Sequence, residues 1–179
     1  MSTRSFICVE QDDGSYKGVY CHSDGYLTYN GAMLLDHYNS REKAREIIAL
    51  GDLSLLCEKL YPDPERPHSF DYDSRQEDVT VAYGRDRGEK GTEAREITLE
   101  DAKESWCEYM YVFGKDGKWS YYNLCEYAPE LRDVETDLAK EFEKMGIERP
   151  ADEYGFFPQS RIDQLKKEQA QKRKNDAVM

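Results

Sequence analysis

The pattern of apolar segments and turn residues predicts two β-hairpins and one further strand in this chain. Residues 6–10 and 16–21 flank an Asp-Gly turn, which tolerates the backbone of a tight hairpin. A second pair of segments, at 106–113 and 119–122, is rich in aromatic residues and flanks a turn with two glycines. The β-branched residues within 78–83 predict the further strand.

Apolar residues spaced three and four apart predict the helices. Residues 41–50 place three apolar side chains on one face, follow a capping Ser40 and stop before Gly51, which suits a left-handed C-terminal cap. We predict further helices at 31–38, 99–104 and 131–145, and one more helical turn at 53–60.

Three segments lack these patterns. Prolines interrupt residues 61–67, which predicts a surface loop, and the glycine-rich and charged residues 84–91 predict a mobile connection. Residues 159–179 have little apolar content and are expected to form a charged tail, helical or frayed. The other patterns predict a single α+β domain over residues 1–158, with an antiparallel sheet built from two hairpins plus a further strand and covered by helices.

Composition indicates a folded domain with a polar surface. The 179 residues are 39% hydrophobic and include 14 tyrosines, at a mean hydropathy of −0.90, whereas disordered chains are poor in aromatic residues. No apolar run reaches the roughly 18 residues of a membrane span, and the first residues lack a signal-peptide pattern, so we expect a cytoplasmic protein that does not enter a membrane. Five cysteines without a C-x-x-C pair are expected to be reduced and buried.

The charge is strongly negative and unevenly distributed. The whole chain has a net charge of −12, whereas residues 1–158 carry 19 basic and 34 acidic side chains, a net charge of −15. Nucleic acids are bound mainly through Lys and Arg that neutralise phosphates, so direct nucleic-acid binding is not expected. Acidic runs at 89–104 and 126–143 could instead imitate the phosphates of DNA for a basic partner, or could simply be solvated helical faces.

Candidate chemistry gathers in residues 19–38, where a strand, a loop and a helix are expected to follow one another. His22 and Asp24 could form an acid–base pair or hold a metal, but we favour a turn at Asp24-Gly25 to which His22 hydrogen-bonds. The candidate ligand-binding residues are His22, Asp24, Gly25, Tyr26, Arg85 and Arg87.

The two arginines of this set follow the further strand on a glycine-flanked loop. There Arg85 and Arg87 could clamp a phosphate or carboxylate, although neighbouring Asp86 and Glu89 could equally neutralise them. A small anionic ligand is therefore one candidate partner of this chain.

No metal, cofactor or catalytic residue is predicted. His37 and His68 could converge with His22, but no H-x-x-x-H or H-E-x-x-H spacing requires it. Cys21 and His22 would point to opposite faces of a strand, which argues against a catalytic pair. Most tyrosines are expected to pack in the core, although exposed ones could stack on bases or anchor a protein partner.

Five short segments together form a specific signature. They are Ser2-Thr3-Arg4-Ser5, Tyr20-Cys21-His22-x-Asp24-Gly25-Tyr26, Gly31 with Leu35 and His37-Tyr38, Leu50-Gly51-Asp52-Leu53-Ser54, and Ala82-Tyr83-x-Arg85-Asp86-Arg87-Gly88. In these segments, over residues 1–125, the chain resembles a family of small bacteriophage and prophage proteins. The resemblance implies a phage origin, and small accessory phage proteins often take over the host or blunt its defences.

Three functions remain open from the sequence. The first is a non-enzymatic phage accessory protein that binds a host protein or nucleoprotein defence complex stoichiometrically, as anti-CRISPR and antirestriction proteins do; it rests on the resemblance and the acidic body. The second is a small-ligand protein that binds or hydrolyses a nucleotide-like anion. The third is a subunit or regulator of a phage nucleic-acid complex, in which the basic tail would contact the nucleic acid. The net charge argues against this third function.

Overall fold

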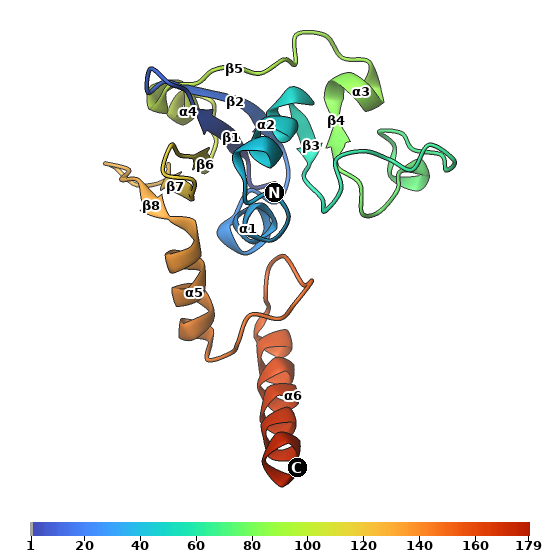
Figure 1. Cartoon of the computed structure of the whole chain (residues 1–179), viewed down its shortest axis with the longest axis vertical. Coiled ribbons are helices and arrows are strands. Elements are labelled where there is room, and N and C mark those ends of the chain that lie inside the picture. Colours follow the sequence, from blue (N-terminus) through green and yellow to red (C-terminus); the bar gives the residue numbers. More distant parts are fainter. Residues whose placement is uncertain (1) are drawn as a thin grey trace.

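A mixed sheet of eight strands with six α-helices forms the protein, whose computed structural model describes residues 2–179 (Figure 1). The strand order is β4-β3-β2-β1-β6-β7-β8, and β5 pairs with β2. The strands are β1 (Ser5–Glu10), β2 (Tyr16–Cys21), β3 (Leu53–Leu55), β4 (Val81–Ala82), β5 (Arg95–Glu96), β6 (Tyr109–Phe113), β7 (Trp119–Asn123) and β8 (Arg132–Asp133). The α+β class expected from the sequence is confirmed.

The two predicted hairpins are confirmed as β1–β2 and β6–β7. Phe6 is opposite Tyr20 in the first, and Phe113 is opposite Trp119 in the second. The hairpins join through a parallel pairing of β1 with β6, and β2 with β3 is also parallel, whereas the other named pairs are antiparallel. The sheet is therefore mixed, because the hairpin pattern fixes pairing within each hairpin but not between them.

Helices cover the two faces of the sheet unequally. They are α1 (Ala32–His37), α2 (Arg41–Ala49), α3 (Tyr83–Arg87), α4 (Leu99–Glu104), α5 (Val134–Met145) and α6 (Gln159–Val178), and a π-helical turn, Leu27–Gly31, leads into α1. The main core packs α1, α2, α5 and the start of α6 against inward residues such as Ile7 and Tyr111. Alternate residues, such as Phe6 and Met110, face a smaller cluster closed by Ile97 and Ala102. The second face is thinly covered.

Helix α2 forms as the sequence predicts. The Ser40 hydroxyl accepts a hydrogen bond from the Lys43 amide at 3.2 Å, and Ala44, Ile47 and Ile48 are buried. Gly51 follows with φ +80°, the left-handed conformation expected there. Local capping and periodicity were sufficient to predict this helix.

The predicted helical turn at 53–60 is wrong. Residues 53–55 form β3, in which Leu53 pairs with Cys21 on one side and Ala82 on the other. Leu53 is buried between these strands. A short apolar run fits a buried strand as well as a helix, and the tertiary pairing decided between them.

Three further segments also differ from the prediction. The strand expected at 78–83 is only β4, and the connection expected at 84–91 begins as α3, because the Asp86 carboxylate accepts from the Ala82 amide at 2.8 Å. The helix expected from 131 begins at Val134, where the Asp133 carboxylate accepts from the Thr136 amide at 2.8 Å.

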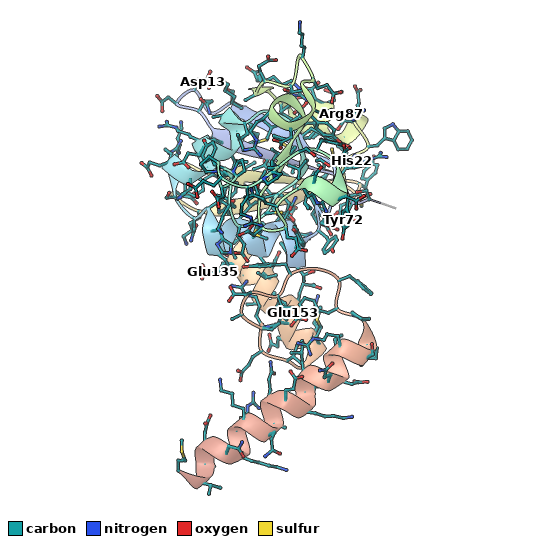
Figure 2. All side chains as sticks on the ribbon, turned by 90° about the vertical axis from the view of Figure 1, so that its right-hand side faces the viewer. Asp13, His22, Tyr72, Arg87, Glu135 and Glu153 are labelled. Atoms are coloured by element: carbon teal, nitrogen blue, oxygen red, sulfur yellow. The ribbon has the colours of Figure 1, made fainter. Side chains whose placement is uncertain are left out.

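The C-terminal residues are helical. Helix α6 projects away from the sheet and ends at the far end of the molecule (Figures 1 and 2). Its first turns pack on the body through buried Ile162 and Leu165. Further along, Gln169 and Arg173 hydrogen-bond to Glu148 in the segment after α5. Within residues 2–179, no helix combines the length and apolar character needed to cross a membrane.

Candidate functional site

His22 lies just beyond the end of β2, on the thinly covered side of the sheet. Its Nδ1 lies 2.8 Å from the Tyr20 hydroxyl, and its carbonyl accepts from the Ser2 hydroxyl at 2.8 Å. Burial is the largest cause that raises the pKa of Tyr20 to about 12. His22 therefore pairs with a partly buried aromatic hydroxyl.

Asp24, Gly25 and Tyr26 serve the turn from β2 into the π-helical turn. Asp24 has a left-handed backbone with φ 54°, and its carbonyl accepts from the Asn30 amide. The Gly25 carbonyl accepts from the buried Tyr111 hydroxyl at 2.7 Å, and a Cβ on Gly25 would lie 2.9 Å from that of Ser5. Burial, followed by the Asp24 carboxylate, raises the pKa of Tyr26 to about 12. The expected turn at Asp24 is therefore present. Within residues 2–179, however, the His22 ring bonds to the Tyr20 hydroxyl and makes no hydrogen bond to Asp24.

Arg85 holds the fold of the loops around it. Its guanidinium donates to the carbonyls of Leu60 and Thr80, the latter at 2.6 Å, and to the Asp86 carboxylate at 2.7 Å. Four of its five donors have partners within the protein when the second bond to Asp86 is included. An anion would have to displace these bonds.

Arg87 has a different environment. Its guanidinium lies 5.0 Å from the centre of the Phe70 ring, which itself packs against Tyr83 at 5.3 Å. Figure 2 shows His22 and Arg87 on the same side of the molecule. Of the predicted ligand-binding residues, His22 and Arg87 therefore share one side of the molecule, whereas Asp24, Gly25 and Tyr26 belong to the turn. The anion-binding hypothesis stays a prediction, and Arg87 is its most accessible cation.

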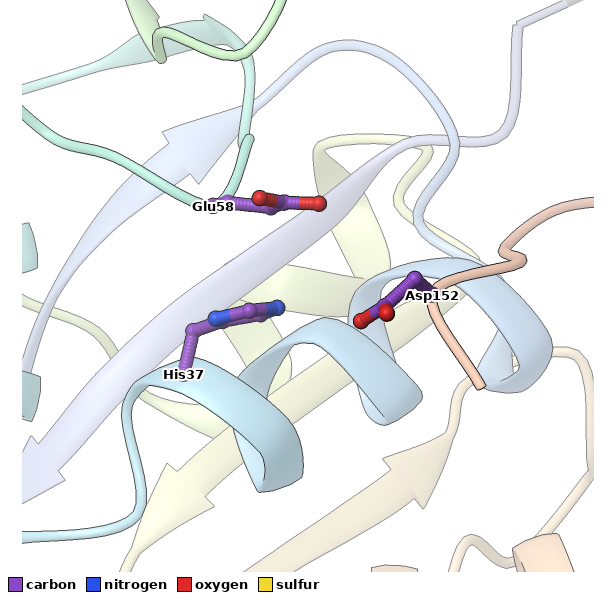
Figure 3. A group of neighbouring side chains, drawn as sticks. All are labelled: His37, Glu58 and Asp152. Carbon is purple, nitrogen blue, oxygen red and sulfur yellow. The ribbon is translucent and has the colours of Figure 1, made fainter. Parts of the chain in front are cut away.

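A different cluster of ligand-type side chains forms around His37. One ring nitrogen of His37 and one carboxylate oxygen each from Glu58 and Asp152 all lie within 4.8 Å of one another (Figure 3). They come from the end of α1, the segment after β3 and the loop before α6. His37 was noted in the sequence, but Glu58 and Asp152 carry no spacing signal, because three distant segments supply the cluster.

The His37 ring is held by a hydrogen-bonded relay. The Tyr154 hydroxyl donates to the Asp36 carboxylate at 2.8 Å and lies 2.9 Å from Nε2 of His37. Because the hydroxyl has only one hydrogen, it accepts from a protonated Nε2, and this tautomer leaves the lone pair on Nδ1. Arg149 completes the relay by pairing with Asp36.

The histidines do not converge. Nδ1 of His68 accepts from the Gln76 amide at 3.1 Å, and Nε2 faces the Asp86 carboxylate at 3.3 Å. The His68 side chain is therefore buried in the proline-rich loop, and it does not belong to the cluster of His37, Glu58 and Asp152.

Two exposed aromatic rings mark another surface, on the side of α4. Trp106 is 82% exposed and Tyr127 is fully exposed. Their segments lie together, since Lys103 donates to the Tyr127 carbonyl at 3.2 Å and the Leu124 amide donates to the Glu108 carbonyl at 2.8 Å. We call residues 99–108 and 124–130 the Trp106–Tyr127 surface.

This surface combines backbone strain with negative charge. Trp106 has φ 62°, a left-handed conformation that costs a non-glycine residue about 1 kcal/mol, and burial of its ring does not offset that cost. The acidic side chains of the surface are Glu100, Asp101, Glu104, Glu108, Glu126 and Glu130, and its only basic one is Lys103. Sequence reasoning noted the acidic runs but missed Trp106, because only the structure shows that the ring is exposed.

Comparisons with protein-family models, with curated proteins and with solved structures found no significant match. The site must therefore be interpreted from its own geometry and charge.

Proposed function

We propose that the protein is a phage accessory protein that binds a host defence component stoichiometrically, as an anti-CRISPR or antirestriction inhibitor does, and that the Trp106–Tyr127 surface makes the contact. The observation that carries the proposal is Trp106, a large exposed ring on a left-handed backbone. Tryptophan and tyrosine are enriched among the residues that dominate protein interfaces. Trp106 follows the end of α4, where a left-handed residue is common but is usually glycine or asparagine.

Charge indicates the chemistry of the partner. The Trp106–Tyr127 surface has six carboxylates, of which Glu126 pairs with Arg132 and Asp101 caps α4. This excess of negative charge favours a basic protein surface, such as the face of a nuclease or restriction enzyme that otherwise contacts DNA phosphates. The rings would enter apolar pockets of that face, and the carboxylates would replace phosphates. No chemical step is needed for such inhibition.

The first test is protection from a defence system. Cells that carry a defined restriction or CRISPR system are challenged with a sensitive phage, with and without this protein, and the efficiency of plating is measured. We expect protection against at least one system, lost in Trp106→Ala and in the charge-reversed Glu104→Lys but retained in His22→Ala.

The second test is direct binding to the purified component of that system. The complex should have fixed stoichiometry, weaken steeply with salt and weaken at least about tenfold in Trp106→Ala, because a central interface tryptophan contributes about 2 kcal/mol or more. Protection or binding that is unchanged in Trp106→Ala and Glu104→Lys would show that the Trp106–Tyr127 surface is not the contact. Absence of protection against every system tested would contradict the inhibitor function itself.

A further inference from the structure

The cluster of His37, Glu58 and Asp152 has the composition of a metal site. It offers one imidazole nitrogen and two carboxylate oxygens, the ligand types that bind Zn²⁺ and related ions. Its members come from segments that only the fold brings together, so sequence neighbourhood does not account for the convergence (Figure 3).

Two carboxylates lie close together here without compensation. Within residues 2–179, neither Glu58 nor Asp152 makes an ion pair or a side-chain hydrogen bond, although both approach His37 within 4.8 Å. Two cations near these segments already have partners, because Arg149 pairs with Asp36 and Lys59 pairs with Asp78. Like charges this close repel each other unless a cation lies between them.

The surroundings supply the remaining requirements of a site. The relay from Asp36 through Tyr154 fixes the His37 ring from its Nε2 side, the role that hydrogen-bonded carboxylates and hydroxyls have around metal-binding histidines. A hollow of about 210 Å³ is lined by Glu58 and Tyr154, together with Glu77 and Asp78, but not by His37 or Asp152. Water ligands on the metal could extend into this hollow from the Glu58 side.

We propose that His37, Glu58 and Asp152 bind a divalent transition-metal ion of the zinc class, with a ring nitrogen of His37 as the nitrogen ligand. Three protein ligands leave open positions, which is typical of an exchangeable or catalytic site and not of a closed structural one. The ion connects the loop before α6 to α1 and to the segment after β3, and it therefore holds the base of α6 against the body.

Isothermal titration of tag-free, metal-stripped protein with ZnCl₂ tests the proposal. We expect one site per chain, with Glu58→Gln and Asp152→Asn each weakening affinity at least about tenfold, since even indirect partners of a metal contribute that much. These isosteric variants are chosen because neither side chain makes a hydrogen bond in the fold. His22→Gln and Glu65→Gln are the matched controls, outside the cluster, and should bind Zn²⁺ as the wild type does.

Hydrogen exchange provides a second readout that does not depend on heat of binding. Zn²⁺ should slow hydrogen exchange in residues 149–158 of the wild type, but it should not change the exchange rate of these residues in Asp152→Asn. Mg²⁺ should not change the rate in either protein. Wild-type affinity for Zn²⁺ weaker than about 0.1 mM, or equal affinity in the wild type and both cluster variants, would overturn the proposal.

Discussion

Arg149 pairs with Asp36 across 113 residues of sequence, and its Nη1 donates to Oδ2 at 2.8 Å. The pair is bidentate, and Tyr154 donates to the same carboxylate. It therefore attaches the loop before α6 to the end of α1, at the base of the segment that projects from the body.

Removal of this pair should loosen the loop and lower stability. We expect Arg149→Ala to reduce the free energy of unfolding by about 1–2 kcal/mol, because a bidentate, partly buried pair with a shared hydroxyl is stronger than an isolated surface pair. Denaturant titration measures the change. Arg173→Ala is the control, since its pair with Glu148 is mostly exposed and should contribute little.

The difference in stability between the wild type and Arg149→Ala should depend on pH. Partial burial alone would raise the pKa of Asp36, but hydrogen bonds from Arg149 and Tyr154 outweigh burial and lower the pKa below its ordinary value of 3.8. A lowered folded-state pKa gives stability that is fully present above pH 3.8 and is lost as the pH falls through the folded-state value. The gap in melting temperature between wild type and Arg149→Ala should therefore narrow below that pH, and a gap that widens there would contradict the assignment.

The two tryptophans should behave in opposite ways. Trp119 is 1% exposed, packs edge-on against Phe113 at 5.2 Å and donates from Nε1 to the Tyr38 carbonyl at 3.0 Å. Trp119→Phe should cost about 2–3 kcal/mol through the cavity and the unpaired carbonyl. Trp106→Ala should leave the unfolding free energy within about 0.5 kcal/mol of wild type, as expected for an exposed residue. A large loss of stability in Trp106→Ala would mean that its effects on binding cannot be separated from folding.

Two left-handed glycines should differ in their tolerance of a side chain. Gly51 has φ +80°, and a Cβ there would lie 2.5 Å from the Thr92 carbonyl oxygen, whereas Gly88 has φ +72° and open space around it. We expect Gly51→Ala to cost about 2 kcal/mol or more and Gly88→Ala about 1 kcal/mol, because only the first adds a backbone clash to the conformational cost. Thermal melts of the two variants measure the difference, and equal losses would exclude the clash.

The cysteines should show one reactive thiol in the native protein. The expectation that all five are buried is wrong for Cys125, which is exposed. Cys8, Cys21, Cys57 and Cys107 are buried, and burial is the largest cause of their raised pKa values. Because the thiolate is the reactive form, a thiol reagent such as DTNB should label one site quickly and all five after denaturation. Cys125→Ser should remove the fast phase, and a fast phase that persists in this variant would show local opening around another cysteine.

The sequence by itself determined the elements whose signals are local. Both hairpins formed where strand patterns flank glycine turns, and α2 formed between Ser40 and Gly51, since capping and turn geometry depend on neighbours in sequence. The charge of the body and the reduced cysteines also follow from residue types alone.

Only the tertiary structure decided how these elements combine. The parallel pairing of β1 with β6 and the strand at Leu53 depend on partners far along the chain, so a local pattern could not specify them. The exposure of Trp106 and the meeting of His37 with Glu58 and Asp152 are likewise consequences of packing between distant segments. For this protein, sequence specified the parts through short-range physics, and long-range packing placed the side chains on which both proposals rest.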